Sequence, residues 1–260
     1  MTQDQRFWRT RLFIPNAVTA LAILCGYIAI IETFQGNYVQ AAYFIIAACI
    51  LDMFDGRLAR LMRSSSAFGV QFDSLADMVN YGVAPALLFY FAYFREWGVA
   101  GIILSFLPVC SAAVRLARYN VAADPDVPTT FFTGLPTTIA ALVLAGFVIF
   151  AQAIALDMPS ASAAALTGLM AFLMVSTVQY EKKNVLSLRY IRKTRRILTA
   201  LIIGISLLAF PRIAFFAWGL LYILYGLVRS IFATLVHWRT LYKHRQATQR
   251  IQKSLQTIHK

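Results

Sequence analysis

Charged side chains are scarce in this sequence. Only 13% of its 260 residues are Asp, Glu, Lys or Arg, while 60% are hydrophobic, and this balance excludes an ordinary soluble domain. Cysteine is also rare. Cys25, Cys49 and Cys110 lie in apolar stretches without metal-like spacing, so we interpret them as small core residues that say nothing about the redox compartment. No internal repeat or low-complexity linker divides the chain, and we treat residues 1–260 as one domain.

The apolar runs that make up most of the chain approach the roughly 20 residues that cross a bilayer. We therefore predict an all-α integral membrane protein with about eight transmembrane helices. The expected spans lie near residues 14–34, 38–59, 71–94, 98–118, 134–154, 160–179, 196–211 and 213–235. The seventh is short and stops at Pro211. The basic start of the chain runs into the first span without a small-x-small exit, so we expect this span to stay as an anchor.

Basic residues predict the orientation of these spans. If both termini are cytoplasmic, all 24 Lys and Arg residues except Arg95 and Arg212 fall on the cytoplasmic side. This bias follows the positive-inside rule and predicts a multi-pass protein of the cell (inner) membrane. Leaving out span 196–211 would move the basic tail, residues 236–260, across the membrane and break the pattern.

The net charge of +13 could also indicate nucleic-acid binding. The basic tail follows a membrane span, however, and more simply binds anionic lipid headgroups, so we expect no nucleic acid. The basic stretch 181–196 has the same interpretation, although it could also hold the phosphates of an anionic substrate.

Four aspartates interrupt the apolar runs, and they are the most informative residues of the chain. An ionised carboxylate in a transmembrane helix costs at least about 2.5 kcal/mol, so four of them need partners. Asp52 and Asp55 are three residues apart, and Asp73 and Asp77 are four apart, so each pair shares one helix face. With a turn at residues 63–66, the two pairs can face each other near the cytoplasmic side. Two divalent cations such as magnesium, manganese or calcium would cancel four carboxylate charges.

The residues around the aspartates fit phosphate chemistry. Gly56 and Gly69 leave room for a bulky ligand, and the small side chain of Ala59, one turn after Asp55, leaves space on the same helix face. Arg60 lies two turns after Asp52 on the same helix, where its guanidinium can hold a phosphate oxygen. The plain alternative is a set of buried ion pairs, but only three arginines are near enough to pair with four carboxylates: Arg57, Arg60 and Arg63.

The pattern Asp52-x2-Asp55-Gly56-x2-Ala59-Arg60-x8-Gly69-x3-Asp73-x3-Asp77 resembles the signature of the CDP-alcohol phosphotransferases, integral membrane enzymes that make phospholipids. With eight positions specified over 26 residues, a chance match is negligible. The resemblance implies attack of an alcohol hydroxyl on a CDP-activated lipid and release of CMP. It also implies that the first three aspartates bind Mg²⁺ or Mn²⁺, with two ions expected, and that Asp77 is the base and also touches the second ion. Gly56, Ala59, Arg60 and Gly69 would form the CDP site.

Three further stretches, 72–86, 115–121 and 132–136, together with 14–19, resemble the bacterial and archaeal members of this family whose acceptor is L-serine. The likeness covers residues 12–140 well and the remainder mainly in the number of spans. It implies that CDP-diacylglycerol and L-serine are the substrates and that the chain forms a homodimer. Other members share the aspartate pattern but use glycerol 3-phosphate, inositol phosphate or choline, and these acceptors remain alternatives.

Serine carries a carboxylate that a fixed cation could bind. Arg115 and Arg118 are three apart at the cytoplasmic end of the fourth span, with Asn120 just beyond, and we slightly prefer Arg118 for this role. Both arginines could equally be interface anchors. Pro85 and Pro136 could kink or start their helices and open a side entry for lipid, or simply pack. A membrane transporter could also hold intramembrane carboxylates, but it would not need glycine and arginine at these offsets.

Overall fold

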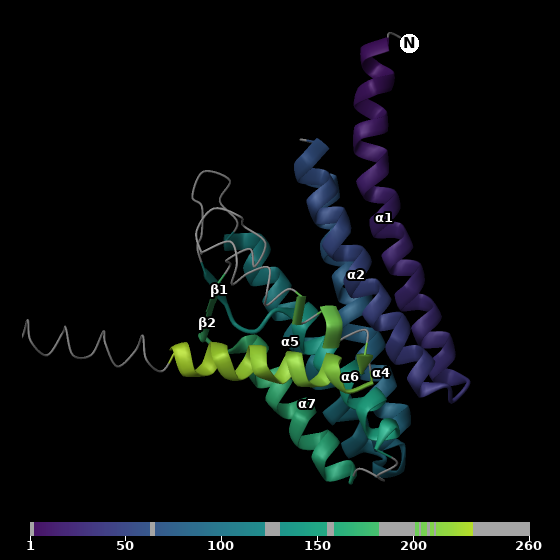
Figure 1. The fold of residues 1–260 in the computed structure, drawn as a ribbon, viewed down its shortest axis with the longest axis vertical. Coiled ribbons are helices and arrows are strands. Elements are labelled where there is room, and N and C mark those ends of the chain that lie inside the picture. The colour runs from purple at the N-terminus through teal and green to yellow at the C-terminus, as the bar shows by residue number, and fades with distance from the viewer. Residues whose placement is uncertain are drawn as a thin grey trace, which may run out of the picture.

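The computed structural model describes residues 3–62, 66–122, 131–154, 159–181, 201–202, 204–206, 209–210 and 212–230. Its α-helices are α1 (Gln3–Phe34), α2 (Tyr38–Met62), α3 (Ala67–Asp77), α4 (Ala84–Phe89), α5 (Val99–Ala122), α6 (Thr137–Ala153) and α7 (Ser160–Val175), and a further helix covers Arg212–Ser230. Two short strands, β1 (Phe131–Thr133) and β2 (Gln179–Glu181), form an antiparallel pair that puts Phe132 opposite Tyr180. Figure 1 shows α1 and α2 side by side at one edge of the helical body.

Five of these helical segments are long and apolar enough to cross a membrane: Ile14–Phe34, Tyr38–Leu58, Phe68–Trp97, Val99–Val121 and Arg212–Ser230. They correspond to the first four predicted spans and to the eighth. The fifth and sixth predicted spans coincide with α6 and α7, which are shorter, with 17 and 16 residues. Most of the predicted span 196–211 lies outside the described residues. A helical membrane protein is therefore confirmed, while the number eight stays a prediction.

A tight turn makes α1 and α2 an antiparallel hairpin. Gly36 has a φ of 84°, a left-handed conformation that glycine adopts without a steric penalty. The Gly36 and Asn37 backbone N–H groups donate to the carbonyls of Thr33 at 3.1 Å and Glu32 at 2.9 Å, which closes the end of α1. Because α2 then runs back along α1, Thr19 in the middle of α1 reaches Asp55 in the later part of α2.

The third span is continuous but not α-helical throughout. Between α3 and α4 the chain forms the π-helical segment η1 (Met78–Val83), and after α4 come a second π-helical segment, η2 (Tyr90–Phe94), and the 3-10 turn η3 (Arg95–Trp97). Pro85 has no N–H to donate back to Tyr81, so the α-helical pattern fails there. The Ala84 N–H instead bonds to Val79 O, five residues back. Pro85 thus lies where η1 gives way to the first turn of α4, and Pro136 is the N-cap of α6.

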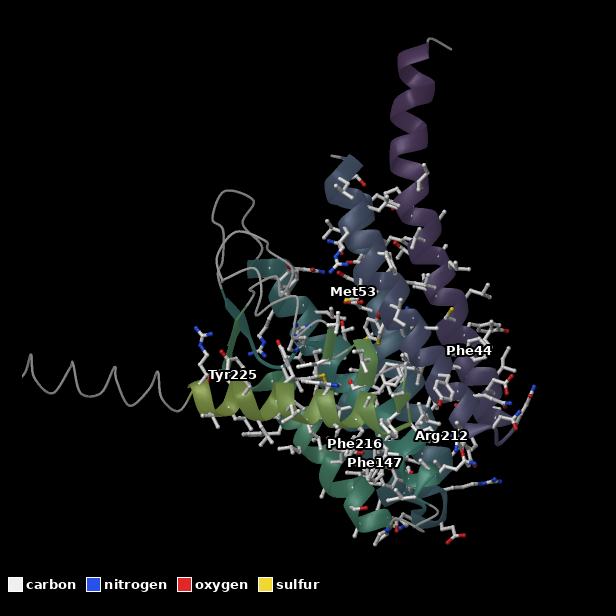
Figure 2. The ribbon with its side chains drawn as sticks, in the orientation of Figure 1. Phe44, Met53, Phe147, Arg212, Phe216 and Tyr225 are labelled. Atoms are coloured by element: carbon white, nitrogen blue, oxygen red, sulfur yellow. The ribbon has the colours of Figure 1, made fainter. Side chains whose placement is uncertain are left out.

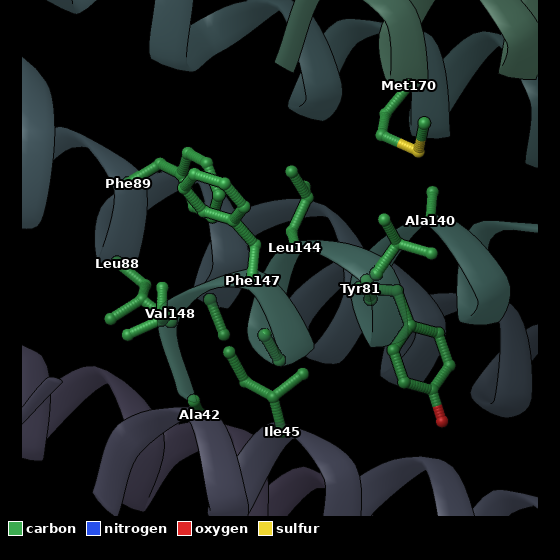
Figure 3. Close-up of a cluster of buried hydrophobic side chains, with 14 of the residues drawn as sticks. Ala42, Ile45, Tyr81, Leu88, Phe89, Ala140, Leu144, Phe147, Val148 and Met170 are labelled. Atoms are coloured by element: carbon green, nitrogen blue, oxygen red, sulfur yellow. The ribbon is translucent and has the colours of Figure 1, made fainter. Parts of the chain in front are cut away.

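The core lies between α2, α4 and α6. The side chains of Ala41, Ala42, Ile45 and Ala48 on α2 are fully buried, as are most residues of α6. Figure 3 shows Ala42 and Ile45 of α2 below Leu144, Phe147 and Val148 of α6, with Leu88 and Phe89 of α4 beside them. In a bilayer, small residues stabilise helix pairs because they let the backbones approach and increase van der Waals contact.

The helix Arg212–Ser230 lies crosswise to α1 and packs on α6 (Figures 1 and 2). Phe216 contacts Phe147 and Phe150 of α6, with ring centroids 5.6 Å and 5.3 Å apart. A Cβ on Gly146 would lie 2.9 Å from the Phe216 backbone nitrogen, so this crossing needs glycine at that position.

Large apolar side chains cover the outside of the described helices. Leu24 and Tyr27 on α1 are 48% and 58% exposed, and Ile103 and Phe106 on α5 are 60% and 57% exposed. Apolar exposure on this scale is costly in water but suits contact with lipid chains, which agrees with the helical membrane class.

Candidate active site

Three of the four predicted aspartates meet at one place. Ligand oxygens of Asp52 and Asp55 on α2 and of Asp73 on α3 all lie within 4.8 Å of one another. The helix α3 that carries Asp73 begins at Ala67 and is capped by Ser66, whose hydroxyl accepts a hydrogen bond from the Gly69 N–H at 3.0 Å. The residues between the two helices, 63–65, lie outside the described part of the chain.

Asp77 ends α3, one turn beyond Asp73, and is not part of the group of three. Its Oδ1 atom is buried and accepts no hydrogen bond from the described residues. Its carboxylate interacts electrostatically with the like charges of Asp52 and Asp73 and with the opposite charge of Arg115. A buried carboxylate oxygen without a donor is costly, so this atom is suited to take a proton or bind a cation.

Two hydroxyl groups from other segments reach the carboxylates of α2. Thr19 on α1 donates to Asp55 Oδ2 at 2.7 Å. Tyr81 in η1 is 1% exposed, donates to Ala48 O at 3.2 Å and also interacts with the Asp52 carboxylate. In Figure 3 its hydroxyl points toward the helix that carries Ile45. Neither residue is predicted from the sequence as part of the site, although Tyr81 lies four residues after Asp77 and Thr19 is a polar residue inside an apolar span.

Arg115 and Arg118, predicted together as acceptor-binding candidates, have different surroundings. Arg115 is only 8% exposed; its Nη1 donates to Thr137 Oγ1 at 3.3 Å, and its charge acts on Asp77. Arg118 is exposed, and its Nη2 donates to the carbonyls of Met174 at 3.4 Å and Val175 at 3.0 Å. Arg118 therefore binds the carboxyl end of α7, where free carbonyls need donors.

Asn120, the third acceptor candidate, bonds to α3. Its Nδ2 lies 3.1 Å from Ser74 Oγ, and the Ser74 hydroxyl also donates to Val70 O at 3.0 Å. Ser74 directly follows Asp73, so this contact ties the end of α5 to the helix that carries the third carboxylate.

The predicted CDP-site residues are described only in part. A Cβ on Gly56 would meet no atom of another described residue within 4 Å, so no described segment covers the face of α2 beside Asp55. A Cβ on Gly69 would lie 3.2 Å from Ser66 Oγ and 3.5 Å from Asn16 Oδ1, so this glycine lies close to the cap of α3 and to α1. The side chains of Ala59 and Arg60 lie outside the described residues, and their role stays a prediction.

The donor set fits a hard divalent cation. Three carboxylates this close repel one another when ionised, and a cation between them removes that repulsion. Oxygen-only ligands suit magnesium, manganese or calcium. The number and identity of the ions stay predictions.

Comparison with known proteins identifies a matching family model and several similar proteins. A family model described as CDP-alcohol phosphatidyltransferase matches residues 12–179. Three proteins named CDP-diacylglycerol--serine O-phosphatidyltransferase are similar to the chain. The Helicobacter pylori (strain J99) protein is 41% identical over 130 residues, which cover 50% of this chain and 54% of that protein. The Mycobacterium tuberculosis (strain H37Rv) protein is 39% identical over 137 residues, 51% of this chain and 48% of that protein. The Bacillus subtilis protein is 33% identical over 132 residues, 51% of this chain and 73% of that protein. The chain thus spans about half the length of the first two.

Proposed function

Because the chain belongs to the CDP-alcohol phosphatidyltransferase family, we propose that it transfers the phosphatidyl group of CDP-diacylglycerol to the hydroxyl of L-serine, giving phosphatidylserine and CMP. The observation that carries the transferase proposal is the meeting of the Asp52, Asp55 and Asp73 carboxylates inside a membrane protein. The names of the relatives support serine as the acceptor.

Asp52, Asp55 and Asp73 hold the metal in this proposal, as Mg²⁺ or Mn²⁺ and with two ions in all. When bound, such ions offset the charge of the pyrophosphate and of the leaving CMP. Gly56 leaves the neighbouring face of α2 open, which supports approach of the CDP group at this point. Gly69, Ala59 and Arg60 complete the CDP site.

Asp77 is the proposed general base. Its buried Oδ1 has no donor among the described residues, so it can accept the proton of the serine hydroxyl. The serine oxygen then attacks the lipid-side phosphorus, the bond from that phosphorus to the bridging oxygen breaks, and CMP leaves with the electron pair. The position of Asp77 beside Asp52 and Asp73 supports a proton acceptor next to the phosphate site, and contact with the second ion is part of the proposal.

Arg115 is the better of the two arginines for the serine carboxylate. It is buried, and its positive charge interacts with the Asp77 carboxylate, so a serine carboxylate bound to it would place the serine hydroxyl near the base. The Arg118 guanidinium already donates to two carbonyls of α7, which supports a structural role. Asn120 supports the site through Ser74 rather than through the acceptor itself.

In the proposed arrangement the chain lies in the cell (inner) membrane, and both termini and the active site face the cytoplasm. The chain contacts anionic lipids and forms a homodimer. The one-sided distribution of Lys and Arg supports this orientation. Single cysteines at positions 36 and 188 should react with membrane-impermeant reagents from opposite sides. Labelling of both from one side would contradict the orientation.

Acceptor choice tests the function directly. Purified protein with CDP-diacylglycerol and Mn²⁺ or Mg²⁺ should release CMP fastest with L-serine, and a chelator should stop the release. Faster release with glycerol 3-phosphate, inositol phosphate or choline would replace the acceptor but keep the reaction class. No CMP release with any of these alcohols would contradict the transferase itself.

A further inference from the structure

One hydroxyl outside the aspartate pattern is aimed at a carboxylate of the site. Thr19 on α1 is 5% exposed, and its Oγ1 donates to Asp55 Oδ2 at 2.7 Å. Asp55 is itself 4% exposed. The contact joins two helices across 36 positions of sequence, so the antiparallel hairpin of α1 and α2 is what makes it possible.

The Thr19 hydroxyl has one hydrogen but two acceptors in reach. Besides Asp55 Oδ2 it approaches Pro15 O, one turn back on its own helix, at the longer distance of 3.1 Å. A hydrogen bond to an ionised carboxylate is shorter and about twice as strong as one to a neutral carbonyl. The hydroxyl therefore serves the carboxylate, and the bond to Pro15 is its alternative within the helix.

Two other buried threonines show what the hydroxyl does without such a partner. Thr33 on α1 donates to Ala29 O, and Thr167 on α7 donates to Ala163 O, both at 2.8 Å. Each satisfies its hydroxyl inside its own helix. Thr19 departs from this pattern, because its short bond leaves the helix and ends on a carboxylate of the site.

We propose that Thr19 is a positioning residue that holds the Asp55 carboxylate in the orientation needed to bind a divalent cation, an inference that rests on the proposed metal site. A carboxylate rotates broadly about its last side-chain bond, and a single strong donor fixes that rotation. Partners of this kind, which touch the ligand rather than the metal, typically contribute 10- to 100-fold to metal affinity.

Manganese binding in the absence of substrate tests the proposal. The full chain in detergent is titrated with Mn²⁺, and free Mn²⁺ is measured by electron paramagnetic resonance for the wild type, Thr19→Val, Thr19→Ser and Thr33→Val. Valine keeps the shape of threonine but has no hydroxyl, so Thr19→Val should bind Mn²⁺ about 10-fold more weakly. Thr19→Ser retains the donor and should stay within about twofold of the wild type. Thr33→Val is the matched control on the same helix and should bind normally.

Turnover adds a second readout. If Thr19 acts only through Asp55, saturating Mn²⁺ should restore the kcat of Thr19→Val to within about threefold of the wild type, so the loss lies in the metal requirement. Should Thr19→Val fail to fold, as judged by thermal unfolding without metal, Thr19→Ala removes the same hydroxyl and carries the same expectation.

Three results would overturn the proposal. Normal Mn²⁺ binding by Thr19→Val would remove the positioning role and leave the metal site standing. An equal loss in Thr33→Val would show general loosening of α1. A wild-type chain that binds no Mn²⁺ would overturn the metal site and this inference together.

Discussion

The two halves of α2 differ in packing. Ala41, Ala42 and Ala48 in the first half are fully buried in the core that α2 shares with α6. In the second half Met53 and Phe54 are 53% and 56% exposed, and no described segment packs against Gly56. The packed half fixes the height and rotation of the helix, while in the open half Asp52 is half-buried and Asp55 is buried against Thr19 of α1. Position and access thus come from different residues of one helix.

The largest effect is expected for Asp77→Asn, at the end of α3 beside the carboxylates of the open half of α2. The amide keeps the shape of the side chain but cannot take a proton at neutral pH, so CMP release should fall by about 10²- to 10⁴-fold. Binding of CDP-diacylglycerol should largely survive, because Asp77 lies outside the group of three carboxylates. Asp52→Asn should instead lose Mn²⁺ binding and activity together. Near-normal CMP release by Asp77→Asn would show that another group is the base.

Substitutions of the two arginines of α5 should separate binding of serine from stability of the fold. Arg115→Ala should raise the serine concentration needed for half-maximal CMP release by at least about 10-fold, because a buried guanidinium near Asp77 is lost. The requirement for CDP-diacylglycerol should change much less. Arg118→Ala should leave the serine requirement within about twofold and lower the unfolding temperature, since the carbonyls at the end of α7 lose a charged donor. The opposite pattern would return the acceptor role to Arg118.

In the packed half of α2, Ala48→Leu should destabilise the protein. A larger side chain at a fully buried position in the core forces the helices apart and costs about 1–3 kcal/mol. Met53→Phe, which also adds three heavy side-chain atoms but at an exposed position of the same helix, should cost less than about 0.5 kcal/mol. Thermal unfolding in detergent compares the two, and equal shifts would mean that the halves of α2 pack alike.

The smallest effect is expected for Tyr81→Phe. Tyr81 contacts both halves of α2, through Ala48 and Asp52. The change removes only the hydroxyl that bonds to Ala48 O, so the free energy of unfolding should fall by about 1 kcal/mol. Because that hydroxyl also interacts with Asp52, Mn²⁺ affinity should fall measurably too. A stability loss with unchanged Mn²⁺ affinity would restrict Tyr81 to packing.

The carboxylate cluster could be predicted from sequence because its signal is local. Residues three or four apart on a helix share a face whatever the rest of the chain does, and the structure brings Asp52, Asp55 and Asp73 together as expected. The first four spans likewise follow from long apolar runs with few charges, and their bounds agree closely with the structure.

The local pattern does not predict which carboxylate each of three other side chains approaches: Thr19 at Asp55, Tyr81 at Asp52 and Arg115 at Asp77. Each depends on how one helix rotates against another, and apolar runs carry little periodicity to set that rotation when both core and lipid are apolar. The spacing of Arg115 and Arg118 predicts a shared face, but only the packing of α5 distinguishes the buried Arg115 from Arg118, which caps α7. The π-helical register of η1 is likewise a response to Pro85 and the surrounding packing, where sequence favoured a kink or a helix start.

That π-helical segment sets how the third span responds to the loss of a residue. A π turn holds about one residue more than an α turn, so the loss of one residue between Asp77 and Pro85 is absorbed when the segment returns to α-helix. A residue lost from α3 between Asp73 and Asp77 meets no such wide turn, and each residue in an α-helix corresponds to about 100° of rotation. Because Leu88 and Phe89 of α4 are fixed in the core at 0% exposure, that rotation would turn Asp73 away from Asp52. A single-residue deletion in η1 should therefore spare the carboxylate cluster, whereas one in α3 should dismantle it.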